Sequence, residues 1–337
     1  MNSYPFVSII IPTYNRGHLL PITLDSFLLQ DYPEDKYEII ISNNNSSDNT
    51  DELLSTYIKK YPNIKVHFEP LQGVHYARNN ASHLARGEIL YFTDDDMIAD
   101  SHLLSEMVKV FINNPKVGSA TGKVLPKWEI PPPVWVKRTM INGLLSLNDL
   151  GDATCVYDYD MGVFSCHQAI RRDAFFQSGG FNPENTAGKW IGDGETGLNI
   201  KIKELGYHFA YVGSSVIYHI IPPSRMTQKY LNKRMANQGN CDAFTSFRAN
   251  YPSKKKLLSG FLSYILIQLL SIGLTPYKIL RSRNLDPIRL SIACLHYLLY
   301  RIRYDLRLLT EKNWRKFVLQ NDWLNTDDEI LGNCFEN

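Results

Sequence analysis

Three adjacent carboxylates follow an apolar stretch of the chain, where Phe92-Thr93 lead directly into Asp94-Asp95-Asp96. Neighbouring carboxylates repel one another, so their charge must be balanced by a cation or by solvent. Mg²⁺ and Mn²⁺ prefer oxygen ligands and commonly join one or two carboxylates to the phosphates of a substrate. In an extended backbone, the side chains of Asp94 and Asp96 point to the same side. The run therefore predicts a divalent-metal site for a phosphorylated ligand, with a solvated acidic turn as the alternative.

The segments that must position these carboxylates alternate between strands and helices. The uninterrupted β-branched run at 7–11 predicts a strand buried on both faces. Three later segments also predict strands, and the segments between them have helical spacing. The predicted strands are 7–11, 37–42, 64–68 and 88–93, and the predicted helices are 18–30, 50–61 and 76–85. Asp48 is placed to cap the second of these helices. The alternation predicts a parallel sheet, whose ligands bind beyond the carboxyl ends of the strands, where the polar clusters of this chain fall.

An ordered series of short motifs resembles family 2 glycosyltransferases of the GT-A fold. The series extends over about residues 5–221, and its order and spacing make it more specific than any single motif. The motifs are Ile10–Arg16, Asn43–Thr50, Gly73 with Ala77-Arg78-Asn79, Phe92–Asp96, Ala169–Arg172, Gly179–Phe181, Gly194–Thr196, Gly206-Tyr207 and Val216–His219. The resemblance implies an α/β, Rossmann-like nucleotide-sugar-binding fold with a mostly parallel central sheet.

The resemblance also implies how the chain is divided. A catalytic domain is expected over residues 1–223, with its nucleotide-binding half at about 1–115 and its acceptor half at 116–223. A helical C-terminal region is expected over residues 224–337.

Donor and metal binding are likewise expected from the resemblance. The residues implied in nucleotide-sugar binding are Pro12, Thr13, Tyr14, Asn15, Arg16, Asn43, Asn44, Arg78, Asp94 and Asp95, and the implied ligands of Mn²⁺ or Mg²⁺ are Asp94, Asp96 and His219. The family usually has acidic residues where this chain has Asn43 and Asn44. An amide both accepts and donates hydrogen bonds, so a UDP-sugar is favoured and another base stays open. The forked donors of Arg78 suit a diphosphate, although a surface arginine is the alternative, and a purely structural histidine is the alternative for His219.

A catalytic base is required on the acceptor side, where a carboxylate removes the proton of the attacking hydroxyl. Members of the family usually supply it from a Glu-Asp pair at the start of a helix. Counting back from Gly206-Tyr207, the resemblance places Glu195 at the position of the base, with Asp193 as the second candidate. The flanking glycines permit close approach of a substrate. Trp190 is expected either to stack on an acceptor sugar or to pack in the core.

The C-terminal third is rich in apolar and basic residues. Residues 257–274 contain no charged residue, but they are short and polar for a bilayer crossing, which takes about 20 apolar residues. Over residues 288–309, arginines interrupt leucines and tyrosines, as in an interfacial helix on an anionic membrane. A helical subdomain packed on the catalytic domain is the alternative. Scattered cysteines without a CxxC pair, and an N-terminus that resembles a strand rather than a signal peptide, predict a cytoplasmic protein, peripheral on the inner face of the cell membrane.

Together these features predict a metal-dependent, inverting hexosyltransferase. It would move a sugar from a nucleoside-diphosphate donor to a saccharide or lipid-linked acceptor in polysaccharide or glycoconjugate synthesis. A nucleotide-sugar-binding protein without catalysis is the alternative. A nucleotidyltransferase would normally carry a Gly-rich phosphate loop near the N-terminus, which Pro12–Arg16 does not form. A formal net charge of +2 is too small to indicate a nucleic-acid partner.

Overall fold

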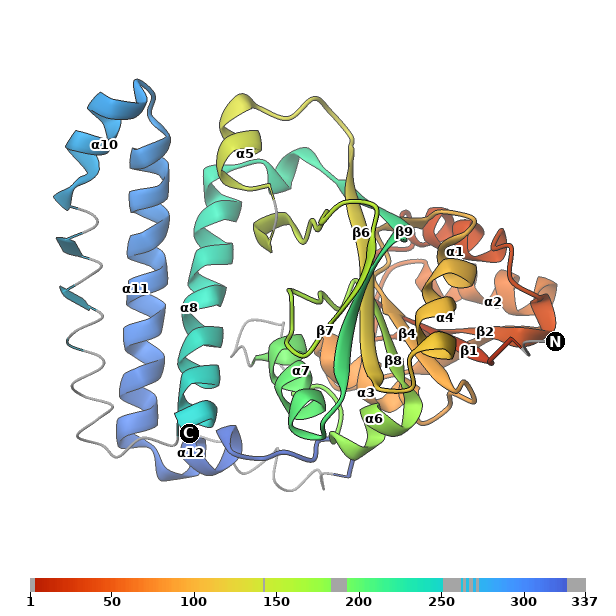
Figure 1. Ribbon diagram of the computed structural model, residues 1–337. Coiled ribbons are helices and arrows are strands. Elements are labelled where there is room, and N and C mark those ends of the chain that lie inside the picture. Colours follow the sequence, from red (N-terminus) through yellow and green to blue (C-terminus); the bar gives the residue numbers. More distant parts are fainter. Residues whose placement is uncertain are drawn as a thin grey trace.

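The computed structural model describes residues 4–141, 143–182, 193–250 and 273–325, together with 262, 265, 266, 269 and 270. In this part of the chain a single curled sheet runs through the catalytic portion, and the helices of the C-terminal portion stand beside it (Figure 1). The nine strands are β1 (Val7–Thr13), β2 (Tyr37–Asn43), β3 (Ile64–Phe68), β4 (Ile89–Thr93), β5 (Met97–Ala99), β6 (Val117–Trp128), β7 (Thr154–Tyr157), β8 (His167–Arg171) and β9 (His208–Ile221).

The sheet is mostly parallel, as predicted. Its strand order is β3-β2-β1-β4-β8-β6-β9-β5, with β7 paired to β9. The pairings give β1, β2, β3, β4, β6 and β9 one direction and the strands β5, β7 and β8 the opposite direction. The carboxyl ends of β1, β2 and β4 therefore meet at one edge, where a ligand is expected.

Helices cover both faces of the sheet. They are α1 (Leu20–Leu28), α2 (Thr50–Lys60), α3 (Val74–Ser82), α4 (Leu103–Asn113), α5 (Val134–Thr139), α6 (Arg172–Gln177) and α7 (Gly194–Glu204). All seven residues of β1 are buried, and they alternate between two cores. Ile9 packs with α1 and α4, whereas Ile10 packs with α3, α6 and α7 on the opposite face. A strand buried on both faces explains why its sequence is an uninterrupted apolar run.

Element boundaries shift slightly from their predicted positions. The helix predicted to begin at Tyr76 begins at Val74, directly after Gly73. Gly73 has a φ of 153° where the chain turns into the helix. Asn49, and not Asp48 as predicted, occupies the N-cap of α2. The Asp48 carboxylate lies one position earlier and accepts the backbone N–H of Thr50 at 3.1 Å.

The C-terminal helices pack against one another and against the catalytic portion. They are α8 (Gln228–Asn250), α10 (Thr275–Ser282), α11 (Asp286–Thr310) and α12 (Lys312–Val318), and α8 and α11 lie side by side (Figure 1). Arg138 on α5 forms an ion pair of 2.6 Å with Asp286, and the Arg289 guanidinium lies 4.6 Å from the centre of the Trp135 ring. Most of the uncharged stretch 257–274 lies outside the described residues. Among the described residues, no helix combines the length and the apolar character that a bilayer crossing needs.

Candidate active site

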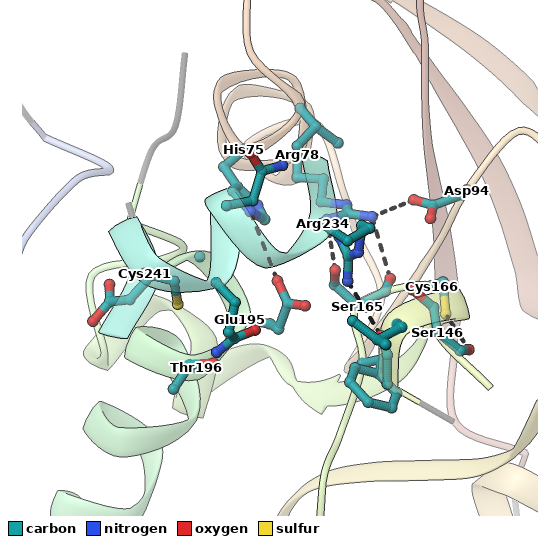
Figure 2. A pocket seen from close by; sticks show the side chains of 18 residues that line it. His75, Arg78, Asp94, Ser146, Ser165, Cys166, Glu195, Thr196, Arg234 and Cys241 are labelled. Carbon is teal, nitrogen blue, oxygen red and sulfur yellow. Dashed lines mark hydrogen bonds and ion pairs between the residues drawn. The ribbon is translucent and has the colours of Figure 1, made fainter. Parts of the chain in front are cut away.

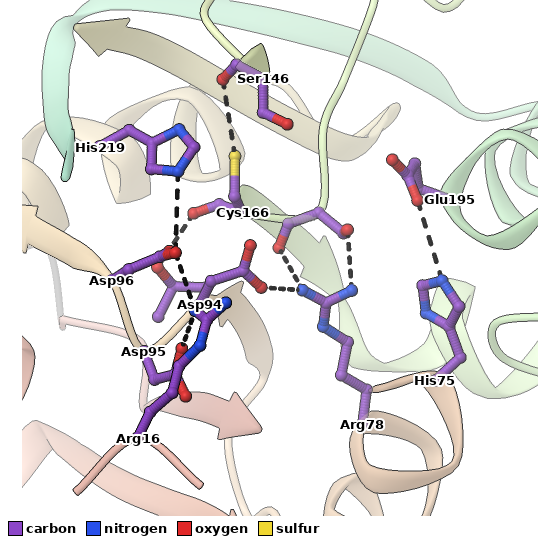
Figure 3. Close-up of polar contacts among 12 residues, drawn as sticks. Arg16, His75, Arg78, Asp94, Asp95, Asp96, Ser146, Cys166, Glu195 and His219 are labelled. Atoms are coloured by element: carbon purple, nitrogen blue, oxygen red, sulfur yellow. Dashed lines mark hydrogen bonds and ion pairs between the residues drawn. The ribbon is translucent and has the colours of Figure 1, made fainter. Parts of the chain in front are cut away.

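The acidic run lies in the turn between β4 and β5, beyond the carboxyl end of β4, and guanidinium groups surround it (Figure 3). Arg16 Nη1 lies 2.7 Å from an Asp95 oxygen and 2.8 Å from Asp96 Oδ2. Arg78 on α3 pairs with Asp94. Burial would raise the pKa of the Asp96 carboxyl, but the guanidinium groups of Arg225 and Arg16 beside it hold that pKa well below its usual range. The run is thus a compensated acidic cluster and not a solvated turn.

His219 lies beside the acidic run because β9 pairs with β5 and places His219 opposite Met97. The His219 Nδ1 lies 2.9 Å from the Leu145 carbonyl oxygen, which accepts only, so this nitrogen carries the proton. The Nε2 lone pair then faces Asp96 Oδ2 at 3.8 Å. A carbonyl that orients the far nitrogen of a histidine in this way is common behind metal ligands. The predicted ligands Asp96 and His219 are therefore brought together.

A metal ion held by Asp96 and His219 would need further ligands from a bound substrate. Within the part of the chain that the structure describes, no three His, Cys, Asp or Glu side chains converge as a ligand set. Asp96 and His219 offer one carboxylate and one imidazole, a chemistry that suits Mn²⁺. The remaining ligands would be diphosphate oxygens and water, which is how Mg²⁺ and Mn²⁺ are usually held at phosphate sites.

A cavity of about 460 Å³ opens above the acidic run. Its lining residues are Pro12, Thr13, Tyr14, Arg16, Asn44, Gln72, Val74, Asp94, Asp95, Asp96, Arg225 and Lys233. Eight of the residues predicted for donor or metal binding are among them. Gln72, Arg225 and Lys233 were not predicted, since no motif marks them and the latter two come from the C-terminal side of β9.

The predicted asparagines mainly shape the loops around this cavity. Asn44 uses its whole amide within the protein: Nδ2 donates to the Glu69 and Leu71 carbonyl oxygens at 3.0 and 2.6 Å, and Oδ1 accepts the Gly73 N–H at 2.8 Å. Asn43 donates to Asp51 at 2.5 Å and Asn15 accepts the Ser47 N–H at 2.7 Å.

Asn15 and Asn43 do not appear among the residues that line the cavity. Their role toward a nucleotide stays a prediction, and so does that of Asn44.

A second cavity, of about 330 Å³, shares Val74 and Asp94 with the first. Figure 2 shows its lining side chains, with Glu195 and Arg234 among them. Glu195 lies on its floor, in the first turn of α7, with its side chain 33% exposed. The Glu195 Oε2 lies 3.9 Å from Nε2 of the buried His75. Burial raises the pKa of the Glu195 carboxyl above its usual value. Gly194 has a φ of 40°, and a Cβ at this position would collide with the His75 ring, so the turn requires glycine.

Asp193, the second candidate for the base, is held inside the protein. Its side chain is fully buried, Oδ1 accepts a hydrogen bond from the Asn182 amide, and Oδ2 accepts one from Thr245 at 3.3 Å. The Arg248 guanidinium lies 3.8 Å from the same Oδ2. These partners occupy both oxygens, so the geometry favours Glu195 over Asp193 as the group that can meet a substrate.

Helix α8 closes the other side of the second cavity with residues that the sequence did not single out. They are Arg234, Asn237, Gln238 and Cys241, spaced three, four and seven residues after the first, as one face of a helix requires. Arg78, by contrast, was predicted near the acidic run, and its 2% exposure excludes a surface arginine. Trp190 lies outside the described residues.

The mostly parallel sheet, with the acidic run beyond the carboxyl end of β4, has the architecture of the GT-A fold. A sequence profile described as glycosyl transferase family 2 matches residues 8–179, about half of the chain, and the protein therefore belongs to this family. The resemblance predicted from the motifs is confirmed.

Individual relatives match over segments of different lengths. Glycosyltransferase AglE of Haloferax volcanii is 36% identical over 96 residues, which cover 28% of this chain and 32% of AglE. Probable glycosyltransferase YdaM of Bacillus subtilis is 24% identical over 236 residues, 66% of this chain and 52% of YdaM. The chain thus spans about a third to a half of these curated relatives.

A solved structure extends the similarity to nearly the whole chain. The mannosyltransferase PcManGT from Pyrobaculum calidifontis, in complex with GDP-Man and Mn²⁺, superposes with a TM-score of 0.58 at 20% identity. The superposition covers 96% of this chain and 89% of PcManGT. It shows a shared GT-A fold that includes the C-terminal helices.

Proposed function

We propose that the protein is an inverting glycosyltransferase in which Glu195 is the catalytic base. One observation carries the proposal: the Glu195 carboxylate is partly exposed in a cavity that shares the lining residues Val74 and Asp94 with the cavity above the acidic run. A sugar attached to a diphosphate in the first cavity would extend toward Glu195 in the second. An acceptor bound against Glu195 would then face the anomeric carbon of that sugar.

In the proposed reaction, the acceptor hydroxyl oxygen forms a bond to the anomeric carbon as the bond from that carbon to the diphosphate oxygen breaks. The Glu195 carboxylate takes the hydroxyl proton. The leaving nucleoside diphosphate gains negative charge, which the cationic side chains of the first cavity stabilise. Of these, Arg16, Arg225 and Lys233 line that cavity directly.

The donor is proposed to bind with a divalent cation. Asp96 and His219 would hold Mn²⁺ or Mg²⁺, with Asp94 nearby, and the ion would neutralise charge on the leaving diphosphate. The structure of PcManGT contains GDP-Man and Mn²⁺. Because the Asn44 amide is engaged within the protein, it does not select a uracil ring by itself, and both UDP-sugars and GDP-sugars are candidates.

The acceptor is proposed to be a saccharide or a lipid-linked saccharide at an anionic membrane surface. Large apolar side chains of the C-terminal helices are exposed, among them Leu280, Leu285, Leu295, Leu299 and Leu306. Arginines are interspersed with them, as on an interfacial helix. Peripheral binding through these helices would leave the catalytic portion facing the cytoplasm and its nucleotide-sugars.

The test is a screen of UDP- and GDP-sugars by thermal shift, with Mn²⁺ and with EDTA. A ligand that binds the folded state alone raises the midpoint of unfolding by mass action. We expect one donor class to stabilise the protein with Mn²⁺ and to be slowly hydrolysed. Binding without hydrolysis or transfer to any acceptor would instead indicate a nucleotide-sugar-binding protein without catalysis, and no binding in either condition would refute the proposal.

A further inference from the structure

Arg225 lies between the two groups that would hold the metal ion. It ends the short turn Pro223–Arg225 that follows β9. Its Nη2 donates to Asp96 Oδ2 at 2.7 Å, and its Nη1 contacts His219 Nε2. The guanidinium therefore bridges the carboxylate and the imidazole, with its side chain only 19% exposed.

The hydrogen bond from Arg225 and a bound metal ion would both need the same lone pair of His219 Nε2. The proton of His219 is on Nδ1, which donates to the Leu145 carbonyl, so Nε2 accepts from Arg225 through its one lone pair. That lone pair cannot bind a metal ion while it accepts a hydrogen bond from an arginine. Asp96 Oδ2 is also occupied, since both Arg16 and Arg225 donate to it.

Charge gives a second reason for competition. The three carboxylates of the run contact three guanidinium groups, from Arg16, Arg78 and Arg225, so the cluster is close to electrically balanced. A divalent cation arriving alone would upset this balance and meet the repulsion of the arginines. A diphosphate arriving with the cation restores the balance and offers oxygens to the forked donors of a displaced arginine.

We propose that Arg225 competes with the divalent cation for Asp96 and His219 and moves to the diphosphate when metal and donor bind together. This inference rests on the proposed function. Arg225 already lines the donor cavity beside Lys233, so a change of side-chain conformation is sufficient for the transfer. Such an exchange would keep the free protein from binding the cation tightly and would couple the cation to its substrate.

The experiment measures binding of Mn²⁺ alone by electron paramagnetic resonance, using the full chain and Arg225→Gln. The variant lacks the competing guanidinium but keeps a flexible, polar side chain without charge. We expect the affinity of the variant for Mn²⁺ without nucleotide to rise about tenfold. The reason is that Mn²⁺ no longer has to displace the charge-assisted hydrogen bonds that Arg225 makes in the unmodified protein. With Mn²⁺ saturating, its affinity for UDP or GDP should fall about tenfold, because the diphosphate loses a partner.

Lys233→Gln is the matched control, because Lys233 lines the same cavity and is not among the described ion-pair partners of Asp96, which are Arg16, His219 and Arg225. It removes one positive charge, and its effect on Mn²⁺ affinity should stay within about threefold. An Arg225→Gln protein whose Mn²⁺ affinity is unchanged or weaker would refute the proposed competition. That result would not count against the proposed donor site. If Mn²⁺ alters nucleotide binding in none of the proteins, the metal-assisted donor site itself fails, and the competition fails with it.

Discussion

Replacing Glu195 by glutamine should abolish transfer without weakening donor binding. The substitution preserves size and removes the ability to accept a proton. General-base catalysis contributes roughly 10²–10⁴-fold, or about 3–5 kcal/mol of activation free energy. Glu195 does not line the 460 Å³ cavity, so the affinity for nucleotide should stay within about twofold. Release of nucleoside diphosphate, with water or an acceptor saccharide as the attacking group, measures the loss, and calorimetry with UDP and GDP measures binding.

Asp193→Asn is the comparison that separates catalysis from structure. Asp193 is fully buried and faces Asn182, Thr245 and Arg248, so an amide there leaves the Arg248 charge without its carboxylate. The loss should appear as about 1–3 kcal/mol of unfolding free energy and a lower melting temperature, whereas turnover per folded molecule should change by less than about tenfold. A folded Asp193→Asn protein without activity, together with an active Glu195→Gln protein, would refute the assignment of the base.

The remaining predictions concern the site and the C-terminal helices. Asp96→Asn should weaken nucleotide binding in Mn²⁺ at least tenfold, and equal affinity in EDTA and in Mn²⁺ for the unmodified protein would contradict the metal role. The base must be deprotonated to act, so kcat/KM should fall as the pH drops through the raised pKa of Glu195; a pH profile with its acidic midpoint at or below the ordinary value of about 4.3 would refute this. The pKa of His75 is lowered well below its usual value by burial, so His75→Gln should leave that midpoint in place. Exchange of Leu295 and Leu299 for glutamine should reduce co-sedimentation with anionic liposomes, and equal sedimentation of both proteins would exclude this surface.

The parallel half of the sheet could be predicted because its strands are buried on both faces. Such strands need apolar side chains in succession, and the predicted ranges 7–11, 37–42 and 88–93 lie within two residues of the observed ends of β1, β2 and β4. The pairing of β7 with β9 was not predicted, because Thr154–Tyr157 alternates between half-buried and exposed residues and has no apolar run.

The carboxylates of the site could be predicted, but their partners could not. Asp94, Asp95 and Asp96 are adjacent in the sequence, so three consecutive carboxylates can be recognised from the sequence alone. Arg225 contacts Asp96 across 129 positions, and neither its own type nor its spacing indicates that contact. His75 was also missed, since a lone histidine at the start of a helix gives no sign that its ring will stack on Phe181 at 4.9 Å and face Glu195.

The position of Glu195 depends on the C-terminal region, which lies beyond the family match. Lys201 on α7 donates to the Gly180 carbonyl at 2.6 Å and to the Asn321 carbonyl at 3.0 Å, and Arg248 on α8 donates to the Gln320 carbonyl at 2.6 Å. These cations are largely buried, so their hydrogen bonds are expensive to break. They fix α7, which begins at Gly194 beside Glu195, against α8, which lines the opposite wall of the second cavity. If the proposed function holds, sequence changes in the C-terminal helices would alter acceptor recognition, while the proposed donor site at the ends of β1, β2 and β4 would stay the same.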